Sequence, residues 1–157
     1  VNNLGGGGSP GAEELWDAVL SSGKVVYGVA DDDSHFFKRI GDPTAPTPGQ
    51  GWIYARAADL SPSSILEALR SGNFYASTGV ELLDYQADDK QITVSVKALT
   101  NSKYNVRFIG KNGRTLSEIP SATATYKIIG DEGYVRAKVL ESNGRAAWTQ
   151  PVFIGKK

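Results

Sequence analysis

The sequence contains no cysteine and no methionine, and only one histidine among its 157 residues. Without cysteine the chain can form neither a disulfide nor a thiolate metal site. Lysine plus arginine equals aspartate plus glutamate at 17 each, so no surplus of positive charge attracts nucleic acid or an anionic membrane. No apolar run reaches the length of a membrane span, and no signal-peptide pattern is present. We therefore expect a soluble chain, cytoplasmic or secreted, that binds neither nucleic acid nor membrane.

The first residues, VNNLGGGGSPG, have the composition of an internal segment of a longer protein. The glycine run resembles a flexible linker. It also leads directly into signals for the start of a helix, because Ser9 can cap a helix and Pro10 suits its first position. We expect the chain to be a fragment of a larger molecule.

Residues 1–83 show the pattern of an α/β layer. The stretch AEELWDAVLSSG has a helical period, and Gly23 suits the position just after the helix. The next stretch, KVVYGVA, is short, β-branched and almost wholly apolar, which is typical of a strand buried on both faces. A second helix is predicted in LSPSSILEALRSG, with Ser61 as its cap and Leu60 packed against Ile65. The expected apolar face of the first helix comprises Ala12, Leu15, Trp16, Val19 and Leu20.

The hydrophobic period changes from helical to alternating soon after Gly79. In QITVSVKAL, for example, Ile92, Val94 and Val96 fall on one face of a strand. Asn-Gly pairs at 112–113 and 143–144 are typical of hairpin turns. About five to seven short strands at regular spacing predict a small antiparallel β-sandwich over residues 84–157. The chain thus divides into an α/β part, 1–83, and an all-β part, 84–157.

The most unusual stretch is ADDDSHFF, which follows the predicted buried strand. Asp33 and His35 are two residues apart, so in an extended segment both side chains point the same way and can reach one cation. Imidazole plus carboxylate suits Zn²⁺, Mn²⁺ or Fe, and water bound to such an ion becomes a nucleophile near neutral pH. The same residues also fit a solvated strand end, with aspartate in a turn and His35 packed beside Phe36 and Phe37.

The surroundings of this motif resemble those of a known family. The stretch from Trp52 to Gly79 contains W, A, then S-x-x-x-I-x-x-A-L-x-x-G-x-x-Y-A-S-T-G. Together with the preceding D-x-H, it resembles the C-terminal part of hydrolases of the polymerase and histidinol phosphatase (PHP) superfamily. The resemblance covers about residues 1–83 and implies a partial PHP-type (β/α) barrel, divalent metal ions and hydrolysis of a small phosphate ester. It makes Asp33 and His35 metal ligands and Asp32 a residue behind them.

The sequence departs from that family in one important respect. Its members carry further histidine ligands upstream, including an H-x-H motif, whereas His35 is the only histidine here. The chain alone therefore cannot assemble the whole metal cluster, and Zn, Mn or Fe is expected only in a longer protein. Asn3 could bind substrate or cap the glycine loop. Lys38 and Arg39 could hold an anionic substrate or lie on a solvated loop.

Two other functions remain open from the sequence. The chain could be a non-catalytic module whose sandwich binds a protein or a glycan, the latter through Trp148 and Tyr134. It could also self-associate through the surface left by the truncated barrel.

Overall fold

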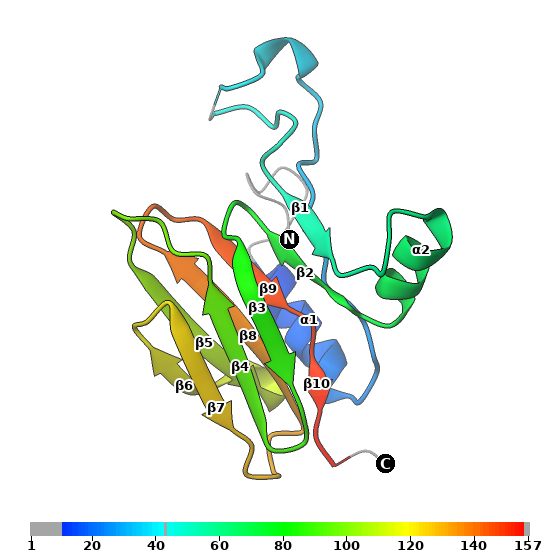
Figure 1. Ribbon diagram of the computed structural model, residues 1–157, viewed down its shortest axis with the longest axis vertical. Coiled ribbons are helices and arrows are strands. Elements are labelled where there is room, and N and C mark those ends of the chain that lie inside the picture. Colours follow the sequence, from blue (N-terminus) through cyan, green and yellow to red (C-terminus); the bar gives the residue numbers. More distant parts are fainter. Residues whose placement is uncertain (1–10, 43, 156–157) are drawn as a thin grey trace.

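The computed structural model of the chain describes residues 11–42 and 44–155 (Figure 1). Two antiparallel sheets lie face to face, and helix α1 (Ala12–Ser21) covers the outer face of the larger one. The larger sheet has the order β1-β2-β9-β8-β5-β6, with β10 also paired to β8, and the smaller has the order β3-β4-β7. Their bounds are β1 Trp52–Ala55, β2 Phe74–Ser77, β3 Leu82–Ala87, β4 Gln91–Val96, β5 Tyr104–Gly110, β6 Arg114–Ile119, β7 Thr123–Lys127, β8 Tyr134–Glu141, β9 Ala146–Thr149 and β10 Val152–Phe153.

The predicted segment of a (β/α) barrel is wrong. Strands β1 and β2 flank helix α2 (Pro62–Arg70), but they pair directly and antiparallel, with Trp52 opposite Ser77. A barrel would need the helix to carry the chain over to a parallel strand. Moreover, β2 pairs with β9, so the large sheet joins strands from both sides of residue 83.

Residues 24–30, predicted as a buried strand, are extended but belong to neither sheet. Val25, Val26 and Val29 are 59%, 45% and 48% exposed. The segment is instead attached by side chains. Gly28 donates its N–H to the Gln150 side-chain oxygen and accepts from the Gln150 amide nitrogen, each at 2.8 Å. The Gln150 side-chain amide thus makes the two hydrogen bonds that the backbone of a neighbouring strand would make to Gly28.

The main core lies between the two sheets. Ile92, Val94 and Val96 are buried on one face of β4, as the alternation predicts. Facing them are Val106 and Phe108 of β5, and both are fully buried. This core holds the two sheets together.

A second core lies between α1 and the outer face of the large sheet. Trp16 and Leu20 are buried there against Tyr134 and Trp148. Leu15, which was expected on the same face, is 68% exposed. The helix therefore buries a narrower stripe than its sequence predicts.

One buried ion pair fixes α1 to the sheet. Arg136 on β8 is 1% exposed, and its Nε and Nη2 donate to the two carboxylate oxygens of Asp17 at 2.8 and 2.7 Å. Tyr134 Oη donates to the same carboxylate at 2.6 Å. The Arg136 guanidinium also lies 4.7 Å from the centre of the Trp16 ring. Burial, followed by the bond to Asp17, raises the pKa of Tyr134.

Helix α2 begins as predicted. The Ser61 side chain accepts from Ser64 N–H, and Pro62 occupies the first turn. The expected contact of Leu60 is wrong, because Leu60 is 94% exposed. Only Ala68 of this helix is buried, and α2 projects from the sandwich at the right of Figure 1.

We predict that Asp17→Asn lowers the free energy of unfolding by about 3 kcal/mol, because it removes the carboxylate that binds the buried Arg136 through two hydrogen bonds and leaves only the longer 3.5 Å contact with Glu13. Chemical denaturation measures the loss. Glu14→Gln is the matched control, since Glu14 lies on the exposed side of the same helix. Equal stability of the two variants would contradict this role for the ion pair.

Candidate functional site

The acidic turn lies at the end of the extended segment, in the part of the chain that projects at the top of Figure 1. Asp33 has a φ of 47°, which is uncommon for a residue other than glycine. Its N–H donates to Asp31 Oδ1 at 3.2 Å, and the N–H of His35 donates to the carbonyl of Pro46 at 3.1 Å. The backbone bends at Asp33, and the far side of the loop supports His35.

Asp33 and His35 lie together, although the backbone at Asp33 is bent and not extended as the prediction from their spacing assumed. Asp33 Oδ1 is 3.7 Å from His35 Nε2, and the side chains are 31% and 63% exposed. Two ligands that each lie about 2.1 Å from one zinc ion can be at most about 4.2 Å apart. The observed separation therefore allows both atoms to bind the same ion. It equally allows a direct ion pair when the histidine is protonated.

A complete metal site needs more ligands than these two. Among residues 11–42 and 44–155, no group of three histidine, cysteine or acidic side chains could hold a metal. Ser34 lies between the two candidate ligands in the sequence. Its Oγ is buried and lacks a hydrogen-bond partner in the described structure. The pair thus fits a metal in part, and the other ligands would have to come from elsewhere.

Asp32 holds the loop rather than pointing to the pair. Its carboxylate accepts the N–H groups of Gly49, Gln50 and Gly51 at 2.5 to 2.9 Å. Burial opposes ionisation of Asp32, but these three bonds outweigh burial and lower its pKa. A Cβ on Gly51 would lie 2.5 Å from the Asp31 carbonyl oxygen, so the loop can close only with glycine there.

The other predicted site residues, Arg39, Lys38 and Asn3, differ in what the structure shows of their contacts. Arg39 pairs with Asp42 and lies 5.6 Å from the centre of the Phe36 ring, so holding a substrate would require this pair to open. Lys38 is exposed in the same short 3₁₀ turn, Phe37–Arg39. Asn3 lies outside the described residues.

Trp148 and Tyr134, proposed above as glycan contacts, are 5% and 1% exposed and belong to the core under α1. A different aromatic group is accessible, and the sequence analysis missed it. Trp52 and Tyr54 lie on one face of β1, with ring centres 6.1 Å apart. Their spacing of two within a strand is the signal that could have identified them.

Comparisons with family models, curated proteins and solved structures find no match for this chain. No helix in the described parts of the chain is long and apolar enough to cross a membrane.

We predict that Asp32→Ala releases the loop over residues 45–51, because three hydrogen bonds to a charged acceptor are lost. Amide exchange at Gln50 and Gly51 should accelerate about tenfold or more, since each such bond contributes about 1.5 to 3 kcal/mol. Asp31→Ala is the control, because Asp31 accepts one long bond within the turn. Unchanged exchange in the Asp32 variant would contradict the role given to this carboxylate.

The same carboxylate predicts a dependence on pH. Because the folded pKa of Asp32 is below its ordinary value of 3.8, its contribution to stability is present above pH 3.8. It is lost as the pH falls through the lower folded value. Exchange at Gly51, corrected for its intrinsic pH dependence, should therefore rise only in that acidic range. A rise already at neutral pH would argue against this account.

Proposed function

We propose that Asp33 and His35 are two ligands of a divalent-cation site in a metal-dependent hydrolase of phosphate esters. The single observation that carries this proposal is the 3.7 Å separation of Asp33 Oδ1 and His35 Nε2. The resemblance of the surrounding sequence to PHP hydrolases supports the substrate class. Zn²⁺, Mn²⁺ or Fe fits a site of imidazole and carboxylate.

The role of this chain is to supply part of the site and to hold it. When bound, a divalent cation provides a Lewis acid that activates water and stabilises charge on a phosphoryl oxygen. The chain contributes the two ligands, and Asp32 keeps the loop behind them in one conformation. Lys38 adds a positive charge near this turn that favours an anionic substrate. The remaining ligands belong to a further segment or to a second molecule.

A second candidate function, self-association or another protein contact, is supported by a separate observation. Apolar side chains along the extended segment and the following turn are exposed, which is common where a protein partner binds. Besides the three valines of the extended segment, they include Phe37 at 66% and Ile40 at 71%. The two functions are compatible, because a partner over this surface would lie beside the incomplete metal site. Sedimentation of the chain over a range of concentrations tests self-association.

We predict that the longest protein encoded by the gene binds Zn²⁺ or Mn²⁺ and that His35→Ala and Asp33→Asn within it each weaken binding about tenfold or more. Even substitutions behind the ligands commonly have effects of that size. Titration calorimetry with each metal alone measures the affinity. Asp89→Asn is the matched control, since it removes one exposed carboxylate from a distant turn. Equal affinity in the unsubstituted protein and all three variants would show that Asp33 and His35 are not metal ligands.

Hydrolysis is tested separately with p-nitrophenyl phosphate and added Mn²⁺ or Zn²⁺, using the chain within the longest protein its gene encodes. We expect metal-dependent release of nitrophenol that His35→Ala abolishes. Metal binding without any hydrolysis would support the metal site and contradict the proposed phosphoesterase activity.

A further inference from the structure

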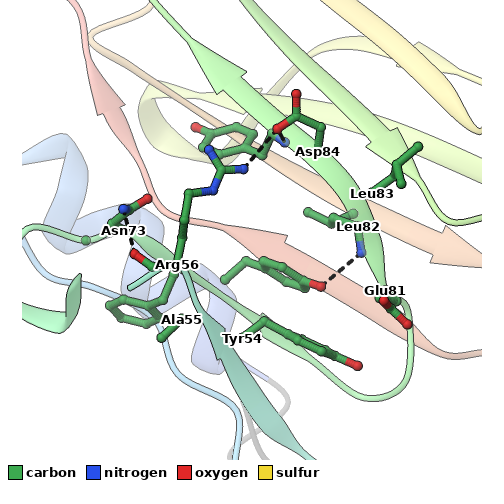
Figure 2. Close-up of a pocket in the computed structure, with 12 residues that line it drawn as sticks. Tyr54, Ala55, Arg56, Asn73, Glu81, Leu82, Leu83 and Asp84 are labelled. Atoms are coloured by element: carbon green, nitrogen blue, oxygen red, sulfur yellow. Dashed lines mark hydrogen bonds and ion pairs between the residues drawn. The ribbon is translucent and has the colours of Figure 1, made fainter. Parts of the chain in front are cut away.

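A cleft of about 280 Å³ lies between the β1–β2 ribbon and the start of β3 (Figure 2). It is separate from the acidic turn, and its walls come from β3, at the edge of the small sheet, and from β1 and β2, the first two strands of the large sheet. One set of walls is aromatic and the other is polar. The aromatic residues are Tyr54, Phe74, Tyr75 and Tyr85, and the polar ones are Arg56, Asn73, Glu81 and Asp84.

The aromatic wall is rigid. Tyr54 and Tyr75 are opposite each other in the β1–β2 register, and their rings are stacked with centres 4.8 Å apart and planes at 16°. Tyr75 Oη accepts the N–H of Leu82 at 2.9 Å, which ties the stack to β3 (Figure 2). Burial raises the pKa of Tyr75 to about 12. A ligand meets a preformed surface, and little side-chain freedom is lost on binding.

The polar wall carries charges that are already balanced. Arg56 Nη2 lies 2.9 Å from Asp84 Oδ1, and Lys97 Nζ lies 3.0 Å from Glu81 Oε1. These pairs are more than 40% exposed, so each contributes little to stability and can shift to accept a ligand. Asn73 donates its side-chain N–H to the carbonyl of Arg56, which orients the amide at the rim (Figure 2).

We propose that this cleft binds one ring of a neutral saccharide. The non-polar C–H face of a sugar ring packs on an aromatic face, while its hydroxyls both donate and accept hydrogen bonds. Carboxylate oxygens, an amide and a guanidinium at the rim meet both needs. The volume lies just below the range of pockets for drug-sized ligands, which suits a single ring.

Charge distinguishes this ligand from others that aromatic clefts bind. A phosphate ester would approach two carboxylates with only one arginine among the lining residues, and Asp84 already pairs with that arginine. A free ammonium ligand would meet that same arginine and would compete with Lys97 for Glu81. A neutral polyol disturbs neither pair. The proposal does not depend on the metal site, since it uses none of its residues.

Trp52 provides a signal for the test. Its ring lies 6.1 Å from that of Tyr54, whereas Trp16 and Trp148 are buried in the core between α1 and the large sheet. The protein is titrated with the methyl glycosides of glucose, galactose, mannose and N-acetylglucosamine. Tryptophan fluorescence and ¹⁵N-resolved NMR shifts are followed. At least one glycoside should give saturable shifts at the Leu82 amide and the Asn73 side chain, with a fluorescence change that Trp52→Phe removes.

Variants separate binding from packing. Tyr54→Leu should weaken binding about tenfold, while Tyr54→Phe, which keeps the ring, should retain it. Arg56→Ala serves if Tyr54→Leu does not fold, because the Arg56 side chain is 60% exposed and can be removed safely. It should weaken binding without changing the melting temperature. Glucose 6-phosphate and choline are the charged competitors.

Three results would overturn the proposal. The first is the absence of saturable shifts with every glycoside. The second is unchanged affinity in both Tyr54→Leu and Arg56→Ala. The third is saturation by glucose 6-phosphate or choline where the neutral sugars fail, which would assign the cleft to a charged ligand.

Discussion

The ion pair between Asp17 and Arg136 is the contact on which the placement of α1, and of the segment that follows it, depends. It is buried, and it holds α1 against the large sheet. The position of Trp16 follows from this ion pair, because the Trp16 ring packs on the Arg136 guanidinium and fills the space beside Gly28. A Cβ on Gly28 would lie 2.8 Å from that ring. Through these contacts the position of the helix sets the path of the segment that leads to Asp33 and His35.

The loop that carries this pair is organised by polar groups rather than by a core. Asp32 provides the acceptor for three consecutive N–H groups, and the loop elsewhere exposes Phe37 and Ile40. A loop of this kind keeps its shape while leaving its outer face open. Such an open face suits a site to which other chain segments contribute.

The sequence predicted features whose causes are local. The cap at Ser61 and the alternation of β4 depend on residues a few positions apart, and both are found. Asp33 and His35 are also close to each other, but the backbone bends at Asp33 and is not the extended segment on which that prediction rested. What failed depends on distant residues. Residues 24–30 have the composition of a buried strand, but Gln150 and Trp16 occupy the places of neighbouring strands.

Charged residues were hardest to interpret. In the sequence, Asp17 and Glu14 are both acidic residues of one predicted helix, and nothing distinguishes them. Only the fold shows that Glu14 is exposed and that Asp17 pairs with Arg136. The resemblance implies that Asp32 lies behind the metal ligands, but the sequence gives no sign of its three hydrogen-bond partners, which lie 17 to 19 positions away. The antiparallel pairing of β1 with β2 was likewise hidden, because a helix between two strands usually accompanies parallel pairing.

The distance along the chain between Asp17 and Arg136 has a consequence for biosynthesis. The two residues are 119 positions apart, and the helix leaves the ribosome first. At roughly 5 to 20 residues per second, the helix waits on the order of 6 to 24 seconds for its partner. During that interval no sheet covers Trp16 and Leu20, so the nascent chain exposes the apolar face of this helix. Chaperones can bind that face until the last strands have been synthesised.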